Sequence, residues 1–480
     1  MARQLGRVDL LLAAALSIAS AVAHLAALLS WDFMPGVDGP YYLIQVRSIL
    51  SGAGMVYGDP PLLFYLAAAA CRLVGDLRLG VSLTVAAMCG LSAAPSYALA
   101  KRLTGSRVAG VASALALSTS PQMFRMAGDL MKNASGILFV VLSVYWLHSA
   151  LAGGEGWWRS ALLSSLSSYL AFLTHSLDFA LTIAFALAYL PLVALALRPR
   201  TPHPGGGVGR RWALSVLPGW AASAATAASL PWLFTDVGKG IAFLRDLLNS
   251  AAGEGPLGAP PRGPLPPRPP PSPPGLVTPG GEYLIAYLVL GVLLAALAFR
   301  ELDGDPWGAS GRAVAVSAAI AVGAWTLVPS LLGLREWAWR FLLVSCVPTS
   351  VIVGAAVGTL VRGALRPILA AALLLPLAVH VPASVAAVHP RIDPVTYADL
   401  VALSRVVPPE SDVRVLCKGL GPYWVEYLLS AAPRGPKGGQ GGGAEIFVIC
   451  RGSPAPQVPG RPIFRGQRIV AVLAPPPPKS

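Results

Sequence analysis

Residues 9–42 read DLLLAAALSIASAVAHLAALLSWDFMPGVDGPYY, an apolar run up to residue 31 followed by a short acidic and aromatic segment. The apolar run is longer than the ~20 residues that a helix needs to cross a bilayer. It follows Arg3 and Arg7, so it predicts an uncleaved anchor with a cytoplasmic N-terminus. A signal peptide is the alternative, because residues 21–23, AVA, have the small-x-small pattern of a cleavage site. In both cases the residues that follow are exported.

The composition is that of a membrane protein, with 55% hydrophobic and 12% charged residues in a chain of 480. A net charge of +14 would favour nucleic acid in a soluble protein. Here the basic residues lie mostly between apolar runs, where they set orientation, so we expect no nucleic-acid partner. The five cysteines form no C-x-x-C pair, which argues against a zinc or iron–sulfur site. A disulfide between Cys417 and Cys450 is possible, since both lie in the polar C-terminal part.

Apolar segments beyond the first bring the expected number of transmembrane helices to about eleven. They lie near residues 79–100, 108–122, 134–152, 160–175, 177–197, 212–234, 282–299, 313–332, 341–361 and 367–388. Another apolar run, Pro61 to Gly75, is short and carries Arg72, which suits an interfacial or re-entrant helix better than a span. If it did span, every later basic loop would change sides and break the positive-inside rule.

This topology predicts an all-α polytopic membrane bundle over residues 1–388, in the cell membrane. Its extracytoplasmic parts would include a first outer loop at 32–78 and a flexible Pro-rich outer loop at 235–281. Residues 389–480 alternate helix-like and strand-like stretches between Gly and Pro. We therefore expect a small C-terminal α/β domain on the extracytoplasmic side.

Asp38 is the first candidate site residue, because it lies just beyond the first span and is followed by Tyr41 and Tyr42, candidate substrate contacts. A carboxylate there can coordinate a divalent metal or deprotonate an acceptor hydroxyl. The structural alternative is a helix N-cap after a Gly turn.

Asp129 lies in the second outer loop, SPQMFRMAGDLMKNASG, four residues after Arg125. If the loop is helical, the two side chains share one face and can pair. A surface ion pair is the structural alternative. Because Asp38 and Asp129 are both expected near the outer membrane surface, they could converge on one Mg²⁺ or Mn²⁺ ion or one phosphosugar.

Three further residues are expected at the outer surface. Arg340, in REWAWRFLL, is shaped to bind phosphate oxygens, although it could instead reach lipid headgroups. His175 ends a span with Asp178 close by and could bind substrate or carry a proton; a polar helix terminus is the alternative. Glu282 lies at the mouth of a later span.

The order of these features resembles the GT-C membrane glycosyltransferases, which include oligosaccharyltransferase catalytic subunits, protein mannosyltransferases and lipid A aminoarabinose transferases. The resemblance rests on Asp38-Gly39-x-Tyr41, the helix after Pro60-Pro61, the KRLTG turn at 101–105, and Asp129. It implies a polyprenyl-phosphate or polyprenyl-diphosphate sugar donor. Asp38 and Asp129 would match the family's two acidic motifs, and Arg340 would match an arginine that contacts the donor phosphate. Apart from the resemblance, Arg125 is a second candidate for binding that phosphate.

The chain departs from oligosaccharyltransferases at two motifs. Leu130 and Met131 follow Asp129 where those enzymes have an acidic-x-acidic pair, and GLGPYWVEYL stands where they carry W-W-D-Y-G. The expected function is therefore sugar transfer to a protein, lipid or glycan acceptor on the extracytoplasmic face. A transporter or flippase of lipid-linked sugars is one alternative. However, ionisable groups are scarce at mid-span, where transporters keep them. A non-catalytic GT-C homologue is the other alternative.

Overall fold

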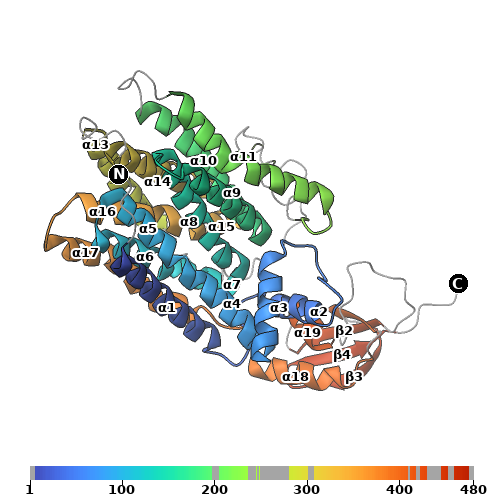
Figure 1. The fold of residues 1–480 in the computed structure, drawn as a ribbon. Coiled ribbons are helices and arrows are strands. Elements are labelled where there is room, and N and C mark those ends of the chain that lie inside the picture. Colours follow the sequence, from blue (N-terminus) through green and yellow to red (C-terminus); the bar gives the residue numbers. More distant parts are fainter. Residues whose placement is uncertain are drawn as a thin grey trace. The chain divides into compact units, whose positions relative to one another are not determined.

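The computed structural model is mostly helical and ends in a small β-sheet (Figure 1). It describes residues 6–196, 205–235, 281–300, 308–408, 411–417, 422–429, 445–451 and 459–474, with Arg245 and Leu248. The predicted Pro-rich loop at 235–281 falls almost wholly outside these residues.

The helices of the first half are α1 (Arg7–Leu29), α2 (Gly39–Leu50), α3 (Leu62–Val74), α4 (Leu77–Leu91), α5 (Ala93–Thr104), α6 (Arg107–Ser118), α7 (Pro121–Asp129), α8 (Met131–Ala152), α9 (Trp157–Thr174), α10 (Ser176–Ala196) and α11 (Gly205–Ser229). Those of the second half are α13 (Gly281–Arg300), α14 (Gly308–Leu331), α15 (Arg335–Val344), α16 (Cys346–Thr359), α17 (Leu365–Ala386), α18 (Pro394–Ser404) and α19 (Pro422–Leu429). The strands are β1 (Asp412–Val415), β2 (Glu445–Cys450), β3 (Arg461–Arg465) and β4 (Ile469–Leu473).

Seven helical segments of the described chain are long and apolar enough to cross a membrane. They are Arg7–Leu29, Leu77–Thr104, Met131–Ala152, Ser176–Leu195, Ser310–Leu331, Trp337–Thr359 and Leu365–Ala386. The chain is therefore a multi-pass membrane protein. The other predicted spans also form helices, α6, α9, α11 and α13, which fall outside this set by length or composition. The count of about eleven stays a prediction.

Two units divide the chain. The first comprises Met1–Ala27, Asp59–Leu63 and Val85–Ala387, and the second comprises Leu28–Gly58, Phe64–Thr84 and Val388–Ser480. The first outer segment thus groups largely with the C-terminal residues. The chain passes into the second unit for the last time at Val388, beside the boundary predicted at 388/389. The predicted domain limits themselves stay a prediction.

Close helix packing in the first unit depends on small residues of α16. This helix contacts α5 and α6 (Figure 1). Gly354 faces Ala100 and Ser113, and a Cβ at residue 354 would lie 2.6 Å from the Cβ of Ala100. One turn later, Gly358 leaves no room for a Cβ beside Thr104. A small-xxx-small pair of this kind lets helix backbones approach closely where lipid provides no hydrophobic drive for association.

Gly358→Val should therefore lower the stability of the protein by about 1–3 kcal/mol or more, because the added side chain overpacks the contact with Thr104. The measurement is the thermal unfolding midpoint in detergent. Gly209→Val is the matched control, since a Cβ at residue 209 of α11 meets no atom within 4 Å. Equal midpoints for the two variants would contradict the close-packing role of Gly358.

The C-terminal part of the second unit is built around a four-stranded sheet with strand order β1-β2-β4-β3. β1 pairs parallel with β2, whereas β4 pairs antiparallel with β2 and with β3. A disulfide joins Cys417 to Cys450, with 5.0 Å between their Cα atoms. The disulfide that the sequence left possible is present, and the predicted small C-terminal sheet is confirmed.

Asp399 ties α18 to the turn between β3 and β4. Its buried carboxylate accepts hydrogen bonds from the backbone N–H groups of Gln467, Arg468 and Ile469, at 3.1, 2.6 and 3.1 Å. At the start of the same helix, Asp393 accepts from Val395 and Thr396 as an N-cap. Burial alone would raise the pKa of Asp393, but the bonds from Thr396 outweigh it and hold that pKa below its ordinary value.

Asp399→Ala should destabilise this turn by about 3 kcal/mol, because three backbone donors lose a charged acceptor. Asp393→Asn is the control and should cost below about 1 kcal/mol, since Asn also caps helices well. Hydrogen exchange of the amides at 467–469, read by mass spectrometry on the full chain, reports the difference. Unchanged exchange in the Ala variant would show that Asp399 does not hold the turn.

Candidate functional site

Asp129 and Arg125 form the central ion pair of the candidate site. α7 begins after Ser120, whose hydroxyl accepts the N–H of Met123, and Pro121 occupies its first turn. The helix places Arg125 and Asp129 on one face, with Nη2 2.5 Å from Oδ2. Both side chains are largely buried. The predicted helical pairing is thus observed, and its burial makes it more than a surface ion pair.

A second ion pair lies where α7 passes into α8. Leu130 interrupts the two helices for one residue, and Lys132 in the first turn of α8 pairs with Asp59. Both partners are nearly buried. This pair has no local sequence signal, because Asp59 and Lys132 lie 73 residues apart in the chain.

Asp178 adds a third buried carboxylate in the first turn of α10. It packs against Gly136 of α8. Lys132 is close enough to act on it electrostatically. Neither carboxylate oxygen of Asp178 has a hydrogen-bond partner among the described residues. Buried carboxylates are normally paired or hydrogen-bonded, so Asp178 joins the candidate residues.

His175 caps α10. Its Nδ1 accepts the N–H of Leu177 at 3.1 Å and lies 3.9 Å from Asp178 Oδ2. An Nδ1 that accepts a hydrogen bond has no proton to donate to the carboxylate. The geometry therefore supports the helix-terminus interpretation of His175. Glu282 is the second residue of α13, and its side chain lies outside the described residues.

Arg340 lies on α15, which contacts α7 in the first unit. Its guanidinium stacks over Trp339, with Cζ 5.4 Å from the ring centroid. The Nε atom is buried and has no hydrogen-bond partner among the described residues. A buried guanidinium N–H on a helix packed against α7 is placed to receive an anion. The Arg340 residue as a whole is half-buried, so contact with lipid headgroups stays the alternative.

His24 of α1 was not a sequence candidate. Its ring stacks on Phe124 of α7, with centroids 4.4 Å apart and an interplanar angle of 11°. His24 Nδ1 lies 2.9 Å from the carbonyl oxygen of Ser20, so Nδ1 carries the proton and the neutral ring has its lone pair on Nε2. That atom is buried without a partner in the described chain. In the sequence His24 is one histidine within an apolar run, and that pattern does not predict a contact with Phe124.

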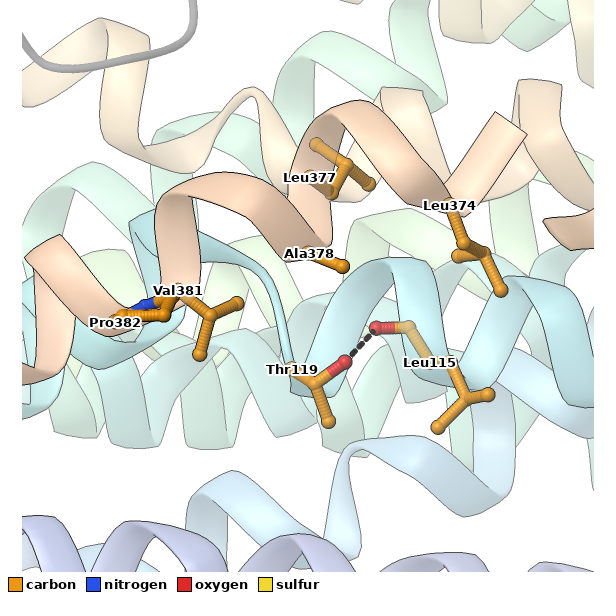
Figure 2. A pocket seen from close by; sticks show the side chains of 7 residues that line it. All are labelled: Leu115, Thr119, Leu374, Leu377, Ala378, Val381 and Pro382. Atoms are coloured by element: carbon orange, nitrogen blue, oxygen red, sulfur yellow. Dashed lines mark hydrogen bonds between the residues drawn. The ribbon is translucent and has the colours of Figure 1, made fainter. Parts of the chain in front are cut away.

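An apolar cavity of about 400 Å³ opens between α6 and α17 (Figure 2). It is lined by Leu115, Thr119, Leu374, Leu377, Ala378, Val381 and Pro382. Thr119 donates its hydroxyl hydrogen to the carbonyl of Leu115 at 2.7 Å, so the polar group of the lining is satisfied. Ser120, the N-cap of α7, follows Thr119 directly. One lining residue of the cavity is therefore adjacent in sequence to the start of the helix that carries Arg125 and Asp129.

Asp38 belongs to the second unit, where it occupies the N-cap position of α2. Its carbonyl accepts the N–H of Tyr42 at 3.2 Å, but its side chain makes no capping hydrogen bond. The turn before it is tight: a Cβ at Gly39 would lie 3.0 Å from the carbonyl oxygen of Met34. Capping therefore does not account for the carboxylate. The expected convergence of Asp38 with Asp129, which lies in the other unit, stays a prediction.

Tyr41 and Tyr42 pack into an aromatic cluster of the second unit. The ring of Tyr41 lies 5.4 Å from Tyr57, 5.8 Å from Phe64 and 5.2 Å from Tyr423. Both tyrosines are at most 8% exposed. Tyr57 donates its hydroxyl to Glu426, and burial together with this bond raises the pKa of Tyr57 well above its ordinary value. This packing explains the two tyrosines without a substrate.

Candidate metal ligands are dispersed over the described part of the chain. Among the described residues, no group of three or more His, Cys, Asp or Glu side chains could hold a metal ion. A Mg²⁺ ion often needs only one or two protein carboxylates when substrate phosphates and water complete its shell. The acidic residues of the described chain fit a Mg²⁺ ion that is bound by one or two carboxylates. They do not fit a site in which protein side chains supply every ligand.

The chain is similar to known proteins in part of its sequence and in its fold. Residues 58–209 match the family model described as dolichyl-phosphate-mannose-protein mannosyltransferase. Among solved structures, the archaeal oligosaccharyltransferase AglB of Archaeoglobus fulgidus matches with a TM-score of 0.55 at 14% sequence identity. The match covers 87% of this chain and 63% of the AglB chain. The chain has a GT-C-like fold.

The predicted resemblance to the GT-C glycosyltransferases is thereby confirmed at the level of the fold. The matched family region contains both ion pairs and Asp178. ArnT of Cupriavidus metallidurans, solved with undecaprenyl phosphate, gives a TM-score of 0.45 at 14% identity, over 97% of each chain. Its apo structure gives 0.44 at 14% identity, over 96% of this chain and 97% of that one. A comparison with curated protein sequences found no match.

Proposed function

We propose that this GT-C-like protein transfers a sugar from a polyprenyl-phosphate or polyprenyl-diphosphate carrier to an acceptor on the extracytoplasmic face of a membrane. The observation that carries the proposal is the apolar cavity between α6 and α17, whose lining residue Thr119 directly precedes Ser120, the N-cap of the helix that carries the Arg125–Asp129 pair. A polyprenyl chain suits the apolar cavity, and its phosphate suits the basic side chain beyond it.

The donor phosphate would be held from two helices. Arg125 lies one helical turn into α7, whose N-terminus carries a partial positive charge. Arg340 on the contacting helix α15 offers a buried Nε–H. The matched family model is described by a dolichyl-phosphate sugar, and AglB was solved with a dolichol-phosphate. These relatives support a lipid-linked donor for this chain.

The chemical step would be an inverting displacement. The acceptor's hydroxyl oxygen or amide nitrogen attacks the anomeric carbon, and the bond between that carbon and the phosphate oxygen breaks. The leaving phosphate takes the bonding electron pair and remains on the polyprenol. We propose that Asp38 takes the proton that the attacking hydroxyl or amide loses. Asp129 would hold Arg125 against the leaving phosphate.

The extracytoplasmic location has two supports. Basic residues of the loops at 101–107 and 362–366 share the side of Arg7 in the predicted topology, which satisfies the positive-inside rule. The Cys417–Cys450 disulfide belongs to a part of the chain predicted on the opposite side, and disulfides persist in oxidising compartments.

A divalent metal is a separate proposal, in which Asp38 or Asp129 would bind Mg²⁺ or Mn²⁺ together with donor phosphate oxygens. Transfer should then stop after EDTA treatment and recover with added Mg²⁺ or Mn²⁺. Transfer that persists in EDTA would assign Asp38 to direct proton removal.

The positions of the buried acidic residues favour a transferase over a transporter. Asp9 and Asp178, the buried acids of the candidate spans, lie in the first turns of α1 and α10 and not at mid-helix. Transport pathways usually place ionisable groups at mid-membrane. A non-catalytic homologue would not explain why the buried carboxylate of Asp178 lacks a hydrogen-bond partner among the described residues.

The test uses purified full-length protein in proteoliposomes with tritiated polyprenyl-phosphate sugars, hexoses and pentoses, and membranes from cells lacking the protein as acceptor source. The proposal predicts label in the acceptor fraction that depends on the protein. Label that crosses the bilayer still attached to its lipid would indicate a flippase. Label that neither moves nor transfers, across the whole donor panel, would indicate a non-catalytic protein.

A further inference from the structure

A second cavity lies at the N-terminal end of α1, in the first unit. Its volume is about 660 Å³. It is lined by Gly6, Asp9, Lys101, Gly105, Ser106, Arg107, Val108 and Arg366. Lys101, Arg107 and Arg366 carry three positive charges against the single carboxylate of Asp9, so the lining is basic.

The negative charge of Asp9 is neutralised by neighbouring basic side chains. Its Oδ1 accepts from Tyr97 Oη and Arg107 Nε, each at 2.9 Å. Its Oδ2 accepts from the backbone N–H of Gly6 at 2.8 Å and from Lys101. The carboxylate is 1% exposed. With both oxygens engaged, Asp9 offers little repulsion to an incoming anion and holds Lys101 and Arg107 at the cavity wall.

The turn between α5 and α6 places further hydrogen-bond donors beside the cavity. α5 ends at Gly105, which has a φ of 72° and donates its N–H to the Lys101 carbonyl at 2.7 Å. Ser106 then caps α6 by accepting from Ala109. The cavity is therefore bordered by the first turn of a 12-residue helix, where backbone N–H groups lack intrahelical acceptors and the helix dipole favours anions.

The two arginines of the lining, Arg107 and Arg366, have further N–H groups that can donate hydrogen bonds. Within the described chain, Arg107 uses Nε for Asp9 and its side chain is 55% exposed. Arg366 uses Nε for the Val361 carbonyl at 3.1 Å and Nη2 for the Gly358 carbonyl at 3.3 Å. A guanidinium has five N–H groups, so both retain groups that can bind phosphate oxygens.

We propose that this cavity binds a phosphate group, carried by an anionic lipid headgroup or by a soluble phosphate ester. Basic pockets between transmembrane helices at a membrane surface bind anionic headgroups, and this one combines three cations with a helix N-terminus. It is separate from the proposed donor site: Arg107 begins α6, whereas Thr119 follows its last residue. At 1.5 Å per residue, these ends are roughly 18 Å apart.

The test uses full-length protein in nanodiscs of phosphatidylcholine. Phosphatidylglycerol is added at increasing fractions, and the thermal unfolding midpoint gives a binding curve; glycerol phosphate and inorganic phosphate are titrated separately. The variants are Arg107→Gln and Arg366→Gln. Arg362→Gln is the matched control, because Arg362 is a neighbouring exposed arginine outside the cavity lining.

Saturable stabilisation is expected in the wild type and in Arg362→Gln, with affinity reduced roughly fivefold by each of the other substitutions. Saturable stabilisation by glycerol phosphate in pure phosphatidylcholine would support a soluble ester as ligand, and response to phosphatidylglycerol alone would support a lipid. Arg366 does not contact Asp9, so its variant tests the site even if Arg107→Gln unfolds. Curves for Arg366→Gln and Arg362→Gln that superimpose, or no saturation in the wild type, would overturn the proposal.

Discussion

Asp38→Asn should lower the rate of sugar transfer by about 10²–10⁴-fold, the range of a general acid–base group, while the thermal unfolding midpoint stays unchanged. The carboxylate makes no capping hydrogen bond to α2, so the isosteric amide removes a proton acceptor without weakening the helix. The Asp38 carbonyl still accepts the N–H of Tyr42. The measurement is initial transfer of tritiated sugar at saturating donor.

Asp32→Asn is the matched control for this prediction. Asp32 lies in the same segment, is exposed and differs from Asp38 in not preceding a helix. Its amide variant should transfer sugar at the wild-type rate. Equal rates for both variants and the wild type would remove Asp38 from the mechanism. Equal loss in both would indicate that the segment needs negative charge in general.

Asp129→Asn should lower donor affinity and transfer by about 10- to 100-fold, because Arg125 loses a charge-assisted hydrogen bond that holds its guanidinium. Arg125→Gln should raise KM for the donor more than it lowers kcat, since it would remove a phosphate contact. Transfer kinetics with varied donor concentration separate these effects.

The double variant Arg125→Gln/Asp129→Asn distinguishes function from structure. If the pair only neutralises two buried charges, removing both should restore stability and also transfer. If the pair serves the donor, stability should return while transfer remains low. Recovered transfer in the double variant would therefore assign Asp129 and Arg125 to structure alone.

Local patterns in the sequence were sufficient for part of the site. The four-residue spacing of Arg125 and Asp129 predicted a pair on a helix, and α7 has it. The departure of Asp129 from an acidic-x-acidic motif was equally readable, since Leu130 and Met131 follow it. Both features depend only on residues close together in the chain.

The remaining site features depend on contacts between distant segments. Lys132 meets Asp59 across 73 residues, and His24 stacks on Phe124 of another helix. Single-sequence periodicity shows which face of a helix is apolar but not which helix covers it. The burial of Asp178 against Gly136 was missed for the same reason.

The fold type was easier to predict from the sequence than the number of spans, which stays a prediction. Long apolar runs identified a multi-pass helical protein, but segments such as 108–122 form helices too short to qualify as spans on their own. Tyr41 and Tyr42 looked like surface aromatics beside an acid, yet both are buried in the second unit. That segment groups with residues near Tyr423, a long-range association that periodicity does not encode.

The most direct test of the central claim is the mass of the carrier lipid after reaction. Purified wild-type protein is incubated with a defined polyprenyl-phosphate sugar and acceptor membranes, and lipid products are quantified by mass spectrometry beside labelled acceptor. We expect one free polyprenyl phosphate for each sugar that appears in the acceptor, and both products to form about 10²–10⁴-fold more slowly with Asp38→Asn. Donor lipid that keeps its sugar under all conditions would contradict it.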